Sequence, residues 1–382
     1  MQRRPSLSAV TSALVTLAAL AACDASPEHA DSPWDWGLPP GFPTPRVPID
    51  NPVGVEKVEL GRWLFHDRRL SGNGTMSCAS CHVQSRAFSE ARATSVGSTG
   101  EVHPRNAMSL ANVAYNTTQT WANPLLVDLE AQALIPMFGT DPVELGLGEG
   151  RDALLARLAA DPDYPPRFAR AFGDASITLE RIVKAIATFE RALVSVDSPY
   201  DRFFYRGDVS AMSEAALRGL DLFFSERLEC FHCHGGFNFN ASSVHATSGF
   251  TETPFFNNGL YNLGGTGAYP EGNRGLFEVT LRPEDMGRFK PPTLRNVTLT
   301  APYMHDGSLP TLEAVIDHYA AGGRLIEDGP LAGDGRANPH KSSFVRGFSL
   351  TPDERSDLLA FLGSLTDATF VTDPRFSDPF VK

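Results

Sequence analysis

Apolar residues recur every three or four positions over several stretches of the chain, and this spacing predicts amphipathic helices. In residues 177–196, for example, Ile182, Ile186 and Phe189 fall on one helical face. The predicted helices cover residues 55–65, 152–172, 177–196, 213–227, 309–321 and 351–365. No convincing pair of strands stands out. The pattern therefore predicts a mainly α fold with long irregular loops.

Two stretches lack this periodicity. Residues 235–289 are rich in Asn, Gly and Phe, a composition typical of irregular structure. We expect this stretch to wrap a cofactor rather than to form a core. Residues 24–52 are rich in Pro, Asp and Ser and contain Trp34 and Trp36, which predicts an extended tether along the body of the protein.

The first 23 residues have the pattern of an export signal. Arg3 and Arg4 precede an apolar run over residues 7–22, which ends in small residues before Cys23. The ending Leu-Ala-Ala-Cys resembles the bacterial lipobox, in which the cysteine is lipidated and becomes the first mature residue. The alternative is an ordinary signal peptide with an incidental cysteine. We expect a periplasmic protein held to the membrane only by a lipid on Cys23.

Length and charge narrow the class of protein. The chain has 382 residues, enough for two domains of ordinary size. Its net charge is -12, and no stripe of Lys and Arg with interleaved aromatics is present, so nucleic-acid binding is not expected. Beyond residue 23 no apolar run is long enough to span a membrane.

Two copies of the pattern Cys-x-x-Cys-His dominate the chemistry. They are Cys78-Ala79-Ser80-Cys81-His82 and Cys230-Phe231-His232-Cys233-His234. The pattern is the attachment signature of c-type haem: two thiols bond to the vinyl groups, and the histidine ligates the iron. A zinc half-site or a redox dithiol would need neither the adjoining histidine nor the repetition. We therefore predict two covalently bound haem c groups.

The number of cysteines and the order of the predicted helices support two haem units. Of the five cysteines, four belong to the motifs and the fifth is Cys23, so none remains for a disulfide. A helix, a motif and a further helix follow one another twice, with a boundary near residue 200. This order predicts two cytochrome c-like domains packed together, an N-terminal one over residues 53–200 and a C-terminal one over residues 201–382.

Several stretches outside the motifs form a specific combination. They are Leu60-Gly61-Arg62-Trp63-Leu64-Phe65, Leu70-Ser71-Gly72, Arg105-Asn106, Leu129-Glu130-Ala131-Gln132-Ala133, Pro292-Thr293-Leu294-Arg295-Asn296-Val297 and Ala301-Pro302-Tyr303-Met304-His305-Asp306-Gly307. Over most of the chain after residue 50, this combination resembles the bacterial di-haem cytochrome c peroxidases and MauG. Residues 34–52 and 260–263 look closest to the methanobactin-associated di-haem enzymes of the MbnH type. The resemblance implies a haem-dependent oxidoreductase that uses H2O2.

The first haem is expected to bind peroxide. A haem with one open axial position can react with peroxide, whereas one with two strong ligands carries electrons. His82 is the proximal ligand, and the loop over residues 95–100, where the family's peroxidases often place a distal histidine, contains none. His103 is the nearest candidate for that role, although an exposed loop histidine is the commoner case.

The resemblance implies three distal-pocket residues for the first haem, namely Gln132, Pro136 and Glu144. Gln132 would orient the bound peroxide by hydrogen bonding. Glu144 would relay a proton from the inner to the outer peroxide oxygen. Without the resemblance, Glu144 would be taken for a solvated loop acid.

The second haem is expected to be six-coordinate, with His234 as its proximal ligand. Candidates for its other side are Met286, Met304, His305, His318 and Tyr319. The resemblance favours Tyr319, the MauG-like ligand, over the methionine of the classical peroxidases. A phenolate stabilises ferric and ferryl iron over ferrous iron. Spacing alone would favour an ordinary core aromatic at Tyr319.

The resemblance also implies a bridge and a calcium site. Trp121 matches the tryptophan that lies between the two haems and offers a site for hole hopping, although most tryptophans serve only packing. Asn106, Thr300 and Pro302 match calcium ligands, one through its side chain and two through their carbonyls. Oxygen ligands completed by water suit Ca²⁺.

Three functions are compatible with the sequence. In the first, H2O2 produces a two-haem ferryl state, shared through Trp121, that oxidises an aromatic residue of an exported partner protein; in the MbnH-like case this residue is a tryptophan that becomes kynurenine. In the second, a peroxidase reduces H2O2 to water with electrons from a small cytochrome. In the third, the protein only carries electrons. Tyr319 and the missing distal histidine favour the first.

Overall fold

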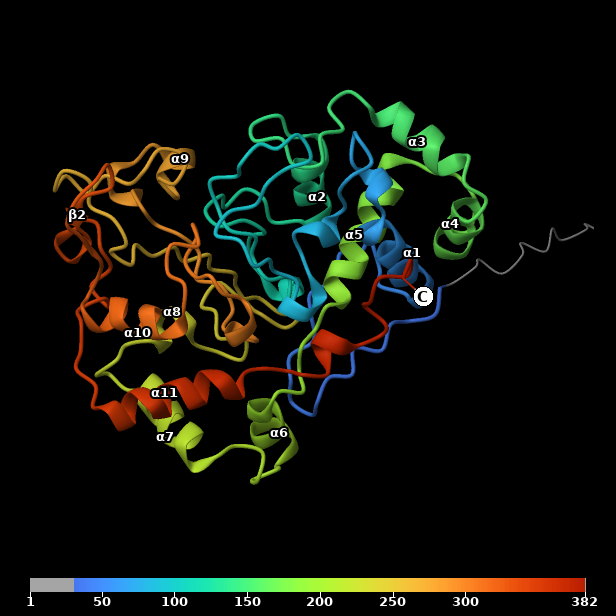
Figure 1. Cartoon of the computed structure of the whole chain (residues 1–382). Helices are drawn as coiled ribbons and strands as arrows, with labels where there is room; N and C mark the ends of the chain where they lie inside the picture. The colour runs from blue at the N-terminus through green and yellow to red at the C-terminus, as the bar shows by residue number, and fades with distance from the viewer. Residues whose placement is uncertain (1–30, 382) are drawn as a thin grey trace, which may run out of the picture.

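The computed structural model describes residues 31–381, whose regular structure is mainly helical (Figure 1). The helices are α1 (Val55–His66), α2 (Leu129–Phe138), α3 (Arg151–Ala159), α4 (Tyr164–Phe172), α5 (Leu179–Ala192), α6 (Pro199–Arg206), α7 (Glu214–Phe223), α8 (Phe231–His234), α9 (Phe277–Thr280), α10 (Leu312–Ala320) and α11 (Pro352–Ser364). Strands β1 (Leu325–Ile326) and β2 (Gly333–Asp334) form an antiparallel pair. Cys23 and the expected signal peptide lie outside the described residues. Within residues 31–381, no helix is long and apolar enough to cross a bilayer.

Five of the six predicted helices are confirmed within a few residues, but the helix predicted over residues 152–172 is wrong. The chain forms α3 and α4 there instead, with a turn at Asp161-Pro162-Asp163 between them. Proline lacks the N–H that an α-helix requires, and α4 restarts with prolines in its first turn. The prediction also missed α2, which contains Pro136.

The first hydrophobic core forms where α1 crosses α5. Leu64 and Phe65 of α1 are fully buried against Ile186 and Phe189 of α5. Gly61 allows this contact, because a Cβ atom there would collide with the Ala185 carbonyl oxygen. The core therefore includes residues just before the first Cys-x-x-Cys-His motif, and Cys78 packs against it.

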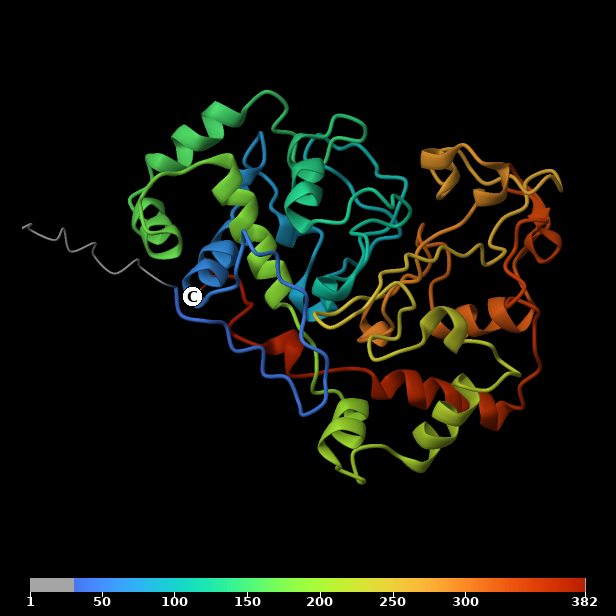
Figure 2. The same ribbon diagram turned by 180° about the vertical axis from the view of Figure 1, so that it is seen from behind.

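The second core lies on the other half of the molecule, where α7 and α11 run side by side (Figures 1 and 2). Its buried aromatic residues include Phe223, Phe239 and Phe361. After α11 the chain crosses back, and Phe370 and Phe376 complete the first core. The last residues of the expected C-terminal unit thus pack with the N-terminal one.

The stretch 235–289 contains little regular structure but does form a core, so the prediction that it would not is wrong. Leu260, Tyr269 and Phe289 are buried together with Ala122. Here asparagine side chains make hydrogen bonds of the kind that paired strands make through their backbones. The Asn257 side chain donates to the Met286 carbonyl oxygen at 2.8 Å and accepts from the Tyr269 hydroxyl at 2.9 Å. Such bonds leave no periodic signal in the sequence.

The described part of the expected tether, residues 31–52, packs on both halves. Phe42 is buried among Tyr115, Tyr205 and Phe237, with ring centroids between 4.9 and 6.1 Å apart. Asn51 is fully buried and donates to Glu130. This segment therefore adds packing between elements that are distant in sequence.

A buried ion pair within the expected C-terminal unit reaches the N-terminal one through a further bond. Arg295 and Asp201 are 1% and 0% exposed, and one guanidinium nitrogen lies 2.8 and 2.9 Å from the two carboxylate oxygens. Arg295 also donates to the carbonyl oxygens of Phe237 and Ser195. A charged pair without solvent is retained only when its remaining donors are satisfied, as they largely are here.

Replacing Arg295 should therefore destabilise the fold strongly. We expect Arg295→Met to lower the free energy of unfolding by about 3–5 kcal/mol, because Asp201 would remain charged and unpaired in the interior. Denaturant unfolding of the purified protein measures this change.

The matched control is Arg282→Met. Arg282 pairs with Glu284 in solvent, so its loss should leave the unfolding midpoint unchanged. If the two variants unfold alike, the ion pair between Arg295 and Asp201 does not stabilise the fold.

Candidate functional site

The first motif presents a histidine that is prepared to bind a metal. Residues Cys78–Ser80 form one 3-10 turn, closed by reciprocal bonds between Ser77 and Ser80. The His82 Nδ1 atom donates to the Phe88 carbonyl oxygen at 2.8 Å, which leaves Nε2 free. Burial lowers the pKa of His82, so the ring is in the neutral form that ligates iron.

The second motif repeats this arrangement. Cys230 precedes α8, and His234 is its last residue. The Nδ1 atom of His234 shares its hydrogen between the carbonyl oxygens of Phe239 at 3.3 Å and Pro292 at 3.2 Å. Burial lowers the pKa of His234 to about 4. The paired thiols and a fixed neutral imidazole at each motif fit a covalently attached haem.

The sequence did not reveal the carbonyl groups that orient these histidines. Phe88 follows His82 by six residues, and Phe239 follows His234 by five. Both phenylalanines have positive φ angles, 59° and 48°, which turn the chain back towards the motif. A phenylalanine at this distance after each motif is the signal that could have indicated them.

The predicted distal residues lie on α2 and on the segment that follows it. Gln132 and Pro136 lie four positions apart on α2 and therefore share a face. The Leu145 N–H donates to the Pro136 carbonyl oxygen at 2.8 Å, which places Glu144 beside that helix. The carboxylate of Glu144 is close enough to Cys78 and Cys81 to raise the pKa of both thiols.

Glu144 lies in surroundings that disfavour its charge. Desolvation raises its pKa from the usual 4.5 to about 7. The nearest basic side chain is that of His103, whose Nε2 atom lies 3.8 Å from the Glu144 Oε1 atom. A carboxyl group with this pKa can both take up and release a proton near neutral pH.

Tyr319 stands beside the second motif. It lies on α10, and burial raises the pKa of its phenol, with further contributions from Cys233 and Cys230. The Tyr319 side chain therefore lies near both motif cysteines. A phenol in this position is compatible with ligation of the second iron.

The other four candidates for that position have different environments. His318 Nε2 lies 3.0 Å from the Asn258 carbonyl oxygen, and Met304 sulfur accepts from the Asn258 amide at 3.2 Å. The His305 ring stacks on Phe289 at 3.7 Å, in the small core that Met286 also contacts.

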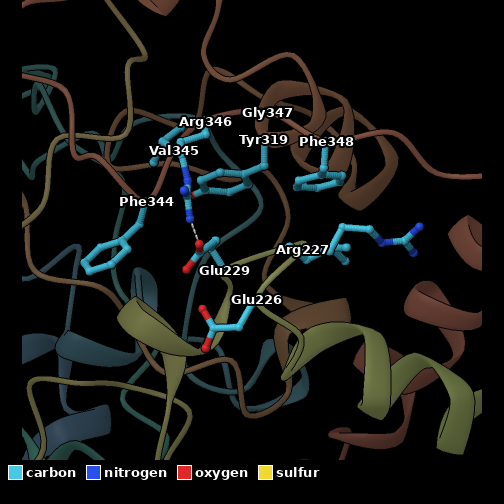
Figure 3. Close-up of a pocket in the computed structure, with 10 residues that line it drawn as sticks. Glu226, Arg227, Glu229, Tyr319, Phe344, Val345, Arg346, Gly347 and Phe348 are labelled. Atoms are coloured by element: carbon cyan, nitrogen blue, oxygen red, sulfur yellow. Dashed lines mark ion pairs between the residues drawn. The ribbon is translucent and has the colours of Figure 1, made fainter.

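A cavity of about 300 Å³ opens next to Tyr319 (Figure 3). Its walls include residues 226–229 and 344–348, and an ion pair between Arg346 and Glu229 crosses it. Ligand atoms of Glu226, Glu229 and His232 lie within 4.8 Å of one another and could hold a metal ion. Arg346 already neutralises Glu229, which opposes a cation there.

Trp121 lies between segments of the two halves. Its indole N–H donates to the Asn106 carbonyl oxygen at 2.9 Å, and its own carbonyl accepts from the Lys290 N–H at 2.8 Å. Lys290 is buried, which lowers the pKa of its ammonium group to about 7. The sequence analysis did not single out Lys290. The signal that could have indicated its burial is its position between Phe289 and two prolines.

The structure brings the predicted calcium residues into one region. The Asn106 N–H donates to the His305 carbonyl oxygen at 2.8 Å, three residues beyond Pro302. Asn106 donates its side-chain amide to the Arg92 carbonyl oxygen at 2.8 Å. Within residues 31–381, no hydrogen bond is accepted by the Asn106 Oδ1 atom or by the carbonyl oxygens of Thr300 and Pro302. These oxygens fit a hard cation.

Comparisons with known proteins agree with this geometry. The model of the di-haem cytochrome c peroxidase family matches residues 55–210. The methylamine utilization protein MauG of Methylorubrum extorquens is 35% identical over 328 residues, covering 86% of this chain and 82% of MauG. The cytochrome-c peroxidase IdrP1 of Denitromonas iodatirespirans is 34% identical, covering 97% of this chain and 96% of the peroxidase.

Solved structures share the fold. A MauG-like protein associated with microbial copper homeostasis has a TM-score of 0.88 and 52% identity, covering 91% of this chain and 99% of that one. The diheme peroxidase BthA from Burkholderia thailandensis has a TM-score of 0.64, covers 89% of this chain and 91% of its own, and at 22% identity is similar in fold alone.

The raised pKa of Glu144 can be measured directly. We expect the carboxyl stretch of Glu144 in infrared difference spectra to disappear with a midpoint of about pH 7 and to be absent in Glu144→Gln. Because the pKa in the folded protein lies above the usual value, ionisation costs stability as the pH rises through about 7. The Gln variant should lose this pH-dependent destabilisation.

The control is Asp141→Asn, at an exposed neighbouring acid. It should keep both the infrared band and the decline in stability with rising pH. A wild-type protein without a band that vanishes near neutral pH would contradict the assignment.

Proposed function

Because the chain belongs to the family of di-haem cytochrome c peroxidases and MauG, we propose that this haem-dependent oxidoreductase uses H2O2 to oxidise an aromatic residue on an exported partner protein. The proposed residue is a tryptophan, and the proposed product is kynurenine. Membership of the family implies two haem c groups. These haems supply the iron that reacts with peroxide and that stores two oxidising equivalents.

The observation that carries the proposal is the position of Tyr319 beside the second motif. A tyrosinate ligand is hard and anionic, so it disfavours the ferrous state that a cytochrome-fed peroxidase requires. The same ligand favours retention of oxidising equivalents. The 52% identical MauG-like structure further supports a MauG-type activity.

At the first motif, Glu144 and Gln132 act on the peroxide. Gln132 orients peroxide by hydrogen bonding, with Pro136 beside it on the same face of α2. The Glu144 carboxylate takes the proton from the inner oxygen and delivers it to the outer oxygen, which leaves as water. A pKa of about 7 suits both transfers.

Trp121 connects the two motifs electronically. Its backbone and indole bonds tie it to Asn106 in one half and to Lys290 in the other. A calcium ion held by Asn106, Thr300 and Pro302 would stabilise the loop whose Asn106 carbonyl oxygen accepts the hydrogen bond from the Trp121 indole. Export and lipidation at Cys23 would place the enzyme in the periplasm with its partner.

A second candidate is a peroxidase that takes electrons from a small cytochrome. The 34% identity to the peroxidase IdrP1 over nearly the whole chain favours it. The two functions differ in what happens to the oxidising equivalents, since only the first modifies a partner protein covalently.

The deciding experiment mixes the holoenzyme with H2O2 and candidate exported partners. Mass spectrometry of the partners should show conversion of a tryptophan to kynurenine only when both enzyme and peroxide are present. Rapid turnover with a reduced small cytochrome, and no modified partner, would support the peroxidase instead.

Tyr319→Met should shift the enzyme towards the peroxidase type. A thioether ligand raises the reduction potential, so we expect partner oxidation to fall about tenfold or more and the second haem to become easier to reduce. Visible spectroscopy and potentiometry measure these changes. Tyr205→Phe, on α6, is the control and should leave partner oxidation and the potential of the second haem unchanged. If the second haem is unaltered in Tyr319→Met, the ligand assignment is wrong.

Trp121→Phe should interrupt communication between the motifs. The first haem should still react with peroxide, while oxidation of the second haem slows by about tenfold or more, because phenylalanine is much harder to oxidise than tryptophan. Stopped-flow spectroscopy separates the two haems. Trp63→Phe is the matched control, since Trp63 packs under Arg167 on the surface of the first core. Equal rates in both variants would remove Trp121 from the pathway.

A further inference from the structure

Residues 95–103 form a small closed hairpin next to Glu144. Val96 and Val102 form an isolated antiparallel bridge. The His103 N–H donates to the Ser95 carbonyl oxygen at 2.8 Å, and the Gly97 N–H donates to the Glu101 carbonyl oxygen at 2.8 Å. His103 is therefore anchored at the end of this hairpin rather than on a free loop.

The hairpin is fastened to the segment that carries Glu144. The Ser98 N–H donates to the Glu144 carbonyl oxygen at 2.7 Å, and the Val143 N–H donates to the Glu101 carboxylate at 2.9 Å. Gly97 makes the close approach possible, because a Cβ atom there would collide with the Val143 carbonyl oxygen. His103 and Glu144 thus belong to one small rigid unit.

The ring of His103 turns its donor towards the carboxylate. The Nδ1 atom accepts from the Arg105 backbone N–H at 3.1 Å, so the neutral ring carries its hydrogen on Nε2. The Nε2 atom lies 3.8 Å from the Glu144 Oε1 atom. This distance is too long for a direct hydrogen bond, and a small rotation or one bridging water closes it.

We propose that His103 is a positioning residue for Glu144: its Nε2–H donates to the carboxylate, directly or through one water, and holds it facing the first motif. This inference rests on the proposed function of Glu144 in the reaction with peroxide. In this role the histidine acts on the carboxylate instead of on the iron.

The charges around the pair support a neutral donor. Burial lowers the pKa of His103, and the neighbouring Arg105 lowers it further. Arg105 is itself paired with Glu278. Glu101 faces the same unit through its bond to the Val143 N–H, and the motif cysteine Cys81 lies near Glu144. A donor hydrogen bond from His103 favours the ionised form of Glu144, which burial disfavours.

Two substitutions of His103 separate a specific donor from a general structural role. Gln retains an N–H group near the position of Nε2, whereas Leu fills the space without a donor. In His103→Leu, the infrared midpoint of Glu144 in the resting holoenzyme should rise by about one pH unit. His103→Gln should return it to the wild-type value. The pH profile of the peroxide reaction should shift in the same direction in His103→Leu.

Glu144→Gln provides the internal check. In this background His103→Leu should change the peroxide rate less than twofold, because His103 acts through the carboxylate. Haem content and thermal unfolding identify any variant that misfolds. His245→Leu serves as a control at a half-buried histidine that contacts Phe237.

An unchanged Glu144 midpoint in His103→Leu, or equal shifts in the Leu and Gln variants, would overturn the inference. The infrared titration needs no partner protein. If the midpoint moves as expected while no partner is oxidised, the proposed function fails and the positioning role stands.

Discussion

The bonds of buried Arg295, to Asp201 and to the Ser195 carbonyl oxygen of the N-terminal unit, are the interaction on which the relation between the two motifs depends. Asp201 lies in the first turn of α6, while Arg295 lies three residues after Pro292, whose carbonyl oxygen accepts from His234. A shift of this pair would therefore move the second proximal histidine relative to the first core. Removing one partner of such a desolvated pair would leave an uncompensated buried charge, so the pair strongly disfavours other arrangements of these segments.

The two motifs hold their histidines in the same way but differ in the residues that stand near them. In both, a backbone carbonyl after the motif orients the histidine, and burial keeps the imidazole neutral. The opposite sides come from unlike elements. A carboxyl group from an irregular segment stands near the first motif, and a phenol from α10 stands near the second. The difference between the two sites therefore originates in the elements around the motifs, not in the motifs themselves.

The sequence was sufficient to predict the motifs and most long helices, since both depend on local patterns. It could not predict α2, because Pro136 argues locally against a helix that tertiary packing nevertheless stabilises. The buried core around Tyr269 was missed because asparagine side chains, which have no periodicity, satisfy its backbone. Nothing local to Glu144 indicated that it faces the first motif. That position follows from the bond of Leu145 to Pro136 and from the bond of Glu144 to Ser98 of the hairpin, which is distant in sequence.

The return of the C-terminal residues to the first core has a consequence for the order of assembly. Phe370 and Phe376 complete the packing around a motif that was synthesised some 290 residues earlier, so this core closes only after the end of the chain has been made. In the closed fold, burial raises the pKa of Cys78, and it raises that of Cys81 to about 11, which makes both thiols poor nucleophiles. Both thiols are therefore better nucleophiles before this core closes than after it.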